Sequence, residues 1–92
     1  GAFIINTARG GIVDENALYQ FLTNGHLGGA ALDVTEQEPI QSDSPLLKLD
    51  NVIITSHIAS YSKESLNAVS MACAKNIIKI INNETPDNIV NK

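Results

Sequence analysis

AFIINTARGG, residues 2–11, places a short apolar run directly before a polar loop that contains two glycines. The run from Ala2 to Asn6 is rich in apolar and β-branched residues, which favours a buried strand. Asp14 follows the loop at a position where its side chain can cap a helix. We therefore predict a strand, a loop and a helix that ends near Gly25, because glycine is common just past a helix end.

Apolar runs and polar loops continue to alternate through the rest of the chain. Two further strands are predicted at residues 29–34 and 51–55, and the polar loop between them contains a segment, 45–47, that can form one helical turn. A last helix is predicted over residues 63–82. The order strand, helix, strand, loop, strand, helix is the α/β pattern, and it predicts about three parallel strands with flanking helices.

Apolar positions at helical spacing predict which helix faces pack inward. The apolar face of the first helix consists of Ala17, Leu18, Phe21 and Leu22, and that of the last helix consists of Leu66, Val69, Cys73 and Ile77. We expect both faces, including the thiol of Cys73, to lie in the core. A three-stranded parallel sheet is small for its class, so the first strand is expected to leave an unpaired edge.

The composition limits the classes of function. The chain has 92 residues, enough for one small domain, and its net charge of -4 comes without a Lys/Arg cluster, which argues against nucleic acid or an anionic membrane as partner. Its single cysteine cannot form an internal disulfide, so a reducing, cytoplasmic location is expected. No apolar run approaches the roughly 20 residues of a membrane span. Because the chain starts at Gly1 and enters a strand at once, we expect a fragment of a longer protein.

Polar residues follow each predicted strand at the point where it ends. Arg9 comes shortly after the first strand, and His57 follows the third. Asp33 lies at the end of the second strand, and Glu38 lies in the loop after it. Ligands of open α/β sheets bind outside the carboxyl ends of the strands. Parallel strands would therefore bring an arginine, two carboxylates and a histidine to one edge, and this predicts a site there.

Each of these residues also has a structural explanation. Arg9 can be a solvated loop cation, and Asp33 can cap a strand end. Glu38 can be a turn residue, and His57 can be a structural histidine. A single site explains all four on one sheet edge more simply than four unrelated structural roles. His26 lies in a turn after a glycine and is assigned no role.

Three segments of the chain resemble one family of enzymes. Residues 5–14 are similar to the arginine motif of the D-isomer-specific 2-hydroxyacid dehydrogenases, residues 28–39 to their aspartate and glutamate segment, and residues 44–59 to their histidine segment. The resemblance covers nearly the whole chain, in order and with natural spacing. Two departures occur: Ser56 stands where proline is common, and residues 60–61 replace a glycine-rich stretch, as in the lactate-type branch.

The resemblance implies an architecture and a reaction. Residues 1–92 would be the C-terminal portion of a nicotinamide-cofactor-binding domain with a partial Rossmann-like, doubly wound fold, and residues 83–92 would lead towards a substrate domain. The family reversibly transfers hydride between NAD(P)H and a 2-keto acid or D-2-hydroxy acid. NAD is the expected cofactor, and NADP stays open because the acidic residue that separates the two lies upstream in such a fold. Which 2-hydroxy acid is the substrate cannot be read from this chain.

The resemblance also assigns roles to individual residues. The implied catalytic set is Arg9, which would hold the substrate carboxylate through two hydrogen bonds, His57 as general acid, and Glu38 as the partner that favours the imidazolium. Asp33 would hold the nicotinamide carboxamide. The full set expected to contact the cofactor is Asn6, Thr7, Ala8, Arg9, Asp33, His57 and Ala59. No metal site is expected.

Two other functions are compatible with the sequence. One is a non-catalytic, NAD-sensing binding module of the same family, which would not need the proton donor His57. The other is a standalone protein that binds a partner through its open sheet edge. We also expect a homo-oligomer, a dimer, because the exposed first strand of the 92-residue chain can pair with a second copy. The 92-residue chain alone is expected to be inactive, because it contains no G-x-G-x-x-G turn and no substrate domain.

Overall fold

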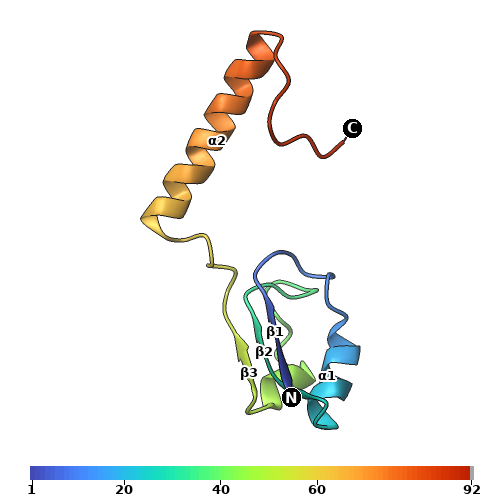
Figure 1. Cartoon of the computed structure of the whole chain (residues 1–92). Helices are drawn as coiled ribbons and strands as arrows, with labels where there is room; N and C mark the ends of the chain where they lie inside the picture. The colour runs from blue at the N-terminus through green and yellow to red at the C-terminus, as the bar shows by residue number, and fades with distance from the viewer. Residues whose placement is uncertain (92) are drawn as a thin grey trace. The chain divides into compact units, whose positions relative to one another are not determined.

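The computed structural model describes residues 1–91 and divides the chain into two compact units, Gly1–Ala59 and Ser60–Lys92. The predicted order of elements is confirmed (Figure 1): β1 (Ala2–Asn6), α1 (Glu15–Thr23), β2 (Leu27–Leu32), the 3₁₀ turn η1 (Pro45–Lys48), β3 (Val52–Ile54) and α2 (Lys63–Ile81). The described part of the tail, Glu84 to Asn91, contains no helix or strand.

The three strands form one parallel sheet in the order β1-β2-β3, which confirms the predicted fold class. Ile5 pairs with Ala31, and Ala31 pairs in turn with Ile53. The second strand begins and ends two residues earlier than predicted, because the chain leaves the sheet at Asp33 to enter the polar loop. Among the described residues β1 pairs only with β2, so it has the free edge that the sequence predicted.

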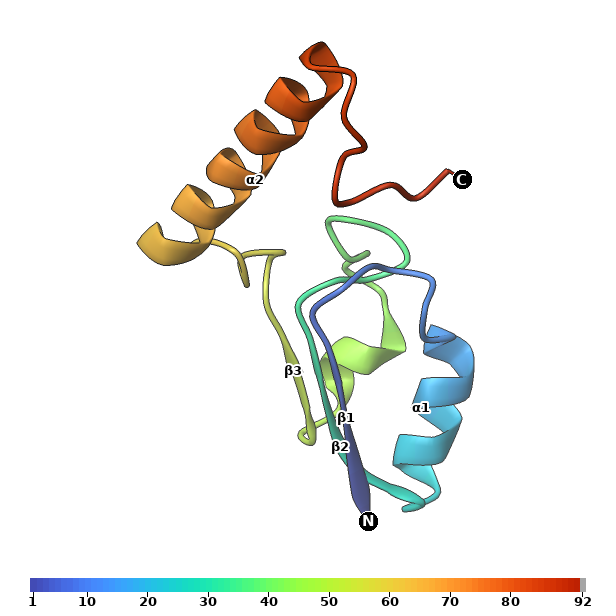
Figure 2. The ribbon, with the colours of Figure 1, turned by 45° about the horizontal axis from the view of Figure 1, so that its top comes forward.

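The core of the first unit lies on one face of the sheet. Figure 2 shows α1 and η1 on the same side of the strands, and the buried cluster joins all three kinds of element: Leu18 and Leu22 from α1, Ala30 and Leu32 from β2, and Leu46 from η1. Side chains on the other face, such as Phe3 and Ile5, are exposed. Within the first unit, α1 and η1 therefore cover only one face of the sheet.

The helix α1 starts and stops where the sequence predicted. The side chain of Asp14 accepts a hydrogen bond from the backbone N–H of Ala17 at 2.9 Å, which caps the helix. Gly25 follows with φ 78°, the left-handed conformation that glycine adopts at no steric cost. Phe21 was expected in the core but is exposed. It lies next to the turn and packs its ring against His26 instead, at a centroid distance of 5.3 Å.

The apolar face of α2 that was predicted to pack inward is not buried within its own unit. Leu66, Val69 and Ile77 are between 53% and 57% exposed, and Cys73 is exposed as well. The helix itself forms as expected, with Ser62 accepting a hydrogen bond from Ser65 N–H at 3.0 Å. The rest of its unit, however, offers polar contacts rather than an apolar surface, so the apolar face of α2 has nothing in its own unit to pack against.

The loop after β2 is tied both to the loop after β1 and to the start of α1. The backbone N–H of Glu15 donates to the carboxylate of Glu36 at 3.0 Å, and the N–H of Glu36 donates to the carboxylate of Glu15 at 2.6 Å. The backbone of Gly10 lies so close to Thr35 that a Cβ on Gly10 would be 1.9 Å from the Thr35 carbonyl oxygen. The loop after β1 and the loop after β2 therefore form one packed layer.

We expect Gly10→Ala to lower the free energy of unfolding by about 1–3 kcal/mol, because an added methyl group forces the two loops apart. Urea unfolding followed by circular dichroism measures the loss. The matched control is Gly1→Ala, whose Cβ would meet nothing within 4 Å. Equal stability of the two alanine variants would show that the loops separate at no cost.

Candidate active site

The carboxyl ends of the three strands meet as the topology predicted. Asp33 N–H donates to the carbonyl oxygen of Asn6 at 2.9 Å, and Thr55 N–H donates to that of Leu32 at 2.9 Å. The hydroxyl of Thr55 also donates to Oδ1 of Asp33 at 2.5 Å. These contacts join residues at the ends of β1, β2 and β3 into one continuous edge.

The loop that carries Arg9 is organised by the side chain of Asn6. This amide is buried; its Oδ1 accepts from Ala8 N–H at 3.1 Å and its Nδ2 donates to the Arg9 carbonyl at 3.0 Å. Such a turn is typical of asparagine, whose side chain binds its own backbone two residues on. Thr7 and Ala8 are exposed at the tip, and the guanidinium of Arg9 donates to the Ala8 carbonyl at 2.7 Å. The role of Asn6 seen here is to shape the loop, and cofactor contact by these residues stays a prediction.

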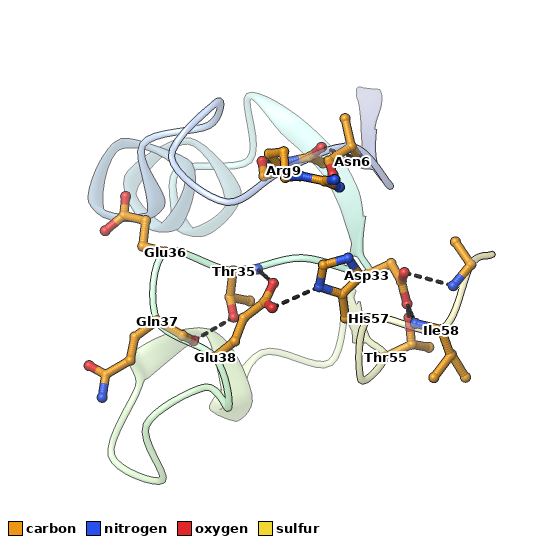
Figure 3. A network of polar contacts seen from close by, with 12 residues as sticks. Asn6, Arg9, Asp33, Thr35, Glu36, Gln37, Glu38, Thr55, His57 and Ile58 are labelled. Atoms are coloured by element: carbon orange, nitrogen blue, oxygen red, sulfur yellow. Dashed lines mark hydrogen bonds and ion pairs between the residues drawn. The ribbon is translucent and has the colours of Figure 1, made fainter. Parts of the chain in front are cut away.

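Glu38 and His57 form the predicted pair. Oε2 of Glu38 lies 2.7 Å from Nδ1 of His57, and Oε1 of Glu38 accepts from the backbone N–H of Thr35 at 3.2 Å (Figure 3). The side chains are 44% (His57) and 39% (Glu38) exposed, so water screens the pair and it adds little to stability. Its main effect is on the imidazole, whose Nδ1 is held by the carboxylate while Nε2 is left for another group.

The electrostatics of the site keep Glu38 ionised. The hydrogen bond from His57 lowers the pKa of Glu38 below its usual value, the Thr35 N–H adds to this, and burial opposes it. A positive charge on His57 lowers the pKa of Glu38 further, and the charge of Arg9 makes the smallest contribution in the same direction. The guanidinium of Arg9 is therefore close enough to act on the Glu38 carboxylate, which places all three predicted catalytic residues in one electrostatic neighbourhood.

Asp33 is buried, with only 6% of its surface exposed. Besides the Thr55 hydroxyl, its Oδ1 accepts from Ile58 N–H at 2.9 Å and its Oδ2 accepts from Ala59 N–H at 2.8 Å (Figure 3). The Thr55 and Ile58 donors are the main causes that lower the pKa of Asp33, against the opposing effect of burial. Sequence reasoning missed Thr55. A hydroxyl residue at the end of the strand next to a buried acid was the available signal.

A cleft of about 390 Å³ opens beside the pair. Its polar lining includes Asp33, Glu38 and His57, and its apolar lining consists of Pro39, Ile40, Leu47 and Ile54. The structure thus brings three of the predicted residues into one cleft. Arg9 and Ala59 do not line it, although Ala59 is tied to Asp33 and Arg9 acts on Glu38 through its charge. The apolar wall was not predicted, because it depends on how the loop after β2 folds back.

The described residues contain neither a metal-ligand cluster nor a helix that could span a membrane. Residues 1–91 contain no group of three or more His, Cys, Asp or Glu side chains that could hold a metal ion. None of the helices in the same range combines the length and apolar character that crossing a membrane requires.

Comparison with known proteins places the chain in a family. Residues 1–59 match the NAD-binding domain of the D-isomer-specific 2-hydroxyacid dehydrogenases. A glyoxylate reductase of Korarchaeum cryptofilum is 47% identical over 91 residues, which is 99% of this chain and 27% of that protein. A D-3-phosphoglycerate dehydrogenase of Archaeoglobus fulgidus is also 47% identical over 91 residues, 99% of this chain and 17% of that protein. The chain thus spans roughly a quarter or less of these relatives.

Solved structures lead to the same family. A D-isomer-specific 2-hydroxyacid dehydrogenase from Xanthobacter autotrophicus Py2, in complex with NADPH and MES, superimposes with a TM-score of 0.81 at 42% identity. The match covers 99% of this chain and 37% of that one. Sequence and fold agree, and the chain belongs to the D-isomer-specific 2-hydroxyacid dehydrogenase family.

Proposed function

We propose that this chain is the C-terminal portion, residues 1–92, of the cofactor-binding domain of an enzyme that reversibly transfers hydride between NAD(P)H and a 2-keto acid or D-2-hydroxy acid. Residues 83–92 would lead towards its substrate domain. The observation that carries the proposal is the contact of 2.7 Å between Glu38 and His57 at the carboxyl ends of parallel strands. The proposal assigns His57, Glu38 and Arg9 to catalysis.

The side chains suit the charge changes of this reaction. When bound, the nicotinamide cofactor supplies or accepts the hydride. As a carbonyl carbon is reduced, its oxygen gains negative charge and needs a proton, which Nε2 of His57 can donate while Glu38 holds Nδ1. Arg9 would hold the substrate carboxylate, since a guanidinium matches a carboxylate with two parallel hydrogen bonds. Reversal returns the proton of the hydroxyl group to the imidazole.

The residues present fit the nicotinamide end of such a cofactor. An ionised carboxylate offers about four acceptor positions, and the chain fills three of those on Asp33, which leaves one for an amide donor such as the carboxamide. The pyrophosphate end has no comparable fit here. The N-terminus of α1 carries Asp14 and Glu15, and these acidic side chains disfavour an anion there. We therefore propose that this chain binds the nicotinamide half alone, with NAD as the cofactor and NADP as the alternative.

Glu38→Gln is expected to narrow the pH range of 2-keto acid reduction. The lowered pKa of Glu38 means that it is a carboxylate throughout the range in which imidazole titrates, so it favours the imidazolium needed as acid. Glutamine has no charge to stabilise a protonated imidazole, so the alkaline limb of the kcat profile should move to lower pH. Steady-state rates from pH 5 to 10 measure this. Gln37→Glu, which adds a charge one residue away, is the control, and an unmoved limb in Glu38→Gln would contradict the pairing.

The function is tested on the complete protein that contains this chain. Loss of NADH and NADPH absorbance is followed with glyoxylate, hydroxypyruvate and phosphohydroxypyruvate, which the names of the relatives suggest, and with pyruvate as a further 2-keto acid. We expect turnover of at least one of them. The 92-residue chain alone should be inactive, because catalysis needs cofactor and carbonyl held against each other. Tight NADH binding without turnover of any 2-keto acid would favour an NAD-sensing module instead.

We also propose a cytoplasmic homo-oligomer, most simply a dimer, without nucleic acid or membrane partners. The net charge of -4 disfavours polyanions, and the single cysteine suits a reducing compartment. The free edge of β1 and the exposed apolar sheet face are surfaces that association can cover. Light scattering of the complete protein tests the oligomeric state.

A further inference from the structure

The loop that carries His57 is held from both sides by one buried carboxylate. Asp33 accepts a hydrogen bond from the Thr55 hydroxyl, two residues before the histidine, and from the N–H groups of Ile58 and Ala59, directly after it. Figure 3 shows Thr55 and Ile58 next to the Asp33 carboxylate, with the ring of His57 directed towards Glu38 instead. The carboxylate thus fixes the chain on each side of the histidine.

The backbone of His57 needs such support. Its φ is 58°, in the left-handed region that residues with a Cβ rarely adopt and that persists only where the surroundings impose it. The His57 side chain is 44% exposed, so packing does little to hold it. The contact with Glu38 orients the ring but does not hold the backbone. The N–H groups of Ile58 and Ala59, both bonded to Asp33, hold the backbone after His57. Before it, Thr55 is held by its N–H, bonded to the Leu32 carbonyl, and by its hydroxyl, bonded to Asp33.

We propose that Asp33 and Thr55 are positioning residues for the imidazole of His57, acting through the conformation of residues 55–59. This rests on the proposed function, in which His57 donates the proton. Asp33 keeps its possible contact with a cofactor carboxamide, whereas Thr55 has its hydroxyl directed at Asp33. Thr55 is therefore the residue whose replacement tests positioning without removing a predicted cofactor contact.

The experiment compares Thr55→Val, which keeps the shape and removes the hydroxyl, with Thr55→Ser, which keeps the hydroxyl, in the complete enzyme. Misplacing a catalytic group by about 1 Å can cost on the order of 100-fold in rate, so we expect Thr55→Val to lower kcat about tenfold or more. The dissociation constant of NADH and the KM of the 2-keto acid should stay near wild type, and Thr55→Ser should restore kcat. Equal loss of kcat in both variants, or a loss confined to NADH binding, would overturn the proposal.

Amide hydrogen exchange gives a second measurement that does not depend on activity. Exchange at Ile58 and Ala59 should be faster in Thr55→Val than in wild type, while the Ala30 N–H, bonded to the Asn51 carbonyl at 3.0 Å, should be unchanged. Unchanged exchange at Ile58 and Ala59 overturns the positioning role whatever the activity. Faster exchange with unchanged kcat would instead show that His57 is not the proton donor, and would overturn the proposed function together with the positioning role.

Discussion

Replacing His57 with alanine in the complete enzyme is expected to lower kcat for 2-keto acid reduction by about 10²- to 10⁴-fold, the usual contribution of a positioned general acid. Binding of NADH should change little, because the imidazole acts on the carbonyl oxygen rather than on the bulk of the cofactor. Its Nε2 is the ring nitrogen that Glu38 leaves available, and the other histidine of the chain, His26, lies before β2 and not at a carboxyl end of the strands. Stopped-flow rates and NADH fluorescence titration separate the two effects.

The matched control is His26→Ala. His26 is the other histidine of the chain, and its ring packs against Phe21 in the turn after α1. Its replacement should leave kcat at the wild-type value. If His57→Ala and His26→Ala have similar rates, His57 is not the proton donor and the Glu38 contact is structural.

Replacing Arg9 with methionine is expected to lower kcat/KM by about 10²- to 10⁴-fold, because two hydrogen bonds to a charged group, each worth about 1.5–3 kcal/mol, are lost together. Arg9 is the single arginine of the chain, and its guanidinium is exposed beside the site. Lysine keeps the charge but not the planar pair of donors, so Arg9→Lys should recover only part of the loss. The effect should fall mainly on the KM of the 2-keto acid.

Lys48→Met, at the end of η1, is the control for loss of one positive charge, and it should leave kcat/KM unchanged. A second measurement varies the substrate rather than the enzyme. If Arg9 grips a carboxylate, a 2-keto amide should be a poor substrate for wild type and should lose little more in Arg9→Met. Equal losses for acid and amide would mean that Arg9 acts elsewhere.

The residues that meet at the carboxyl edge of the sheet could be predicted, because the parallel order of the strands alone decides which residues lie there. Parallel strands put Asn6, Asp33 and Thr55 on one edge, and the structure confirms this arrangement. The contact between Glu38 and His57 was also predicted, from the order of polar residues and from the family resemblance, and it is confirmed at 2.7 Å. The catalytic and cofactor-binding roles of these residues stay predictions.

Other features depended on information that residue types do not carry. The hydrogen bonds from Ile58 and Ala59 to Asp33 require a left-handed backbone at His57, and no pattern of side chains indicates that conformation. The exposed face of α2 shows a different limit. A repeat of apolar residues at helical spacing indicates that a helix has an apolar side, but what covers that side depends on surfaces elsewhere, and the second unit does not supply one.

The reciprocal hydrogen bonds of Glu15 and Glu36 have a consequence for protein engineering. Each glutamate caps the backbone of the other loop, and Gly10 leaves room for Thr35, whose N–H supports Glu38. If only one of these segments were replaced by that of a homologue, a carboxylate and a backbone N–H group in the other segment would lose their hydrogen-bond partners. Variant libraries that aim to change substrate preference should therefore exchange the two segments together. The segments act as one unit although Glu15 and Glu36 are 21 residues apart in the sequence.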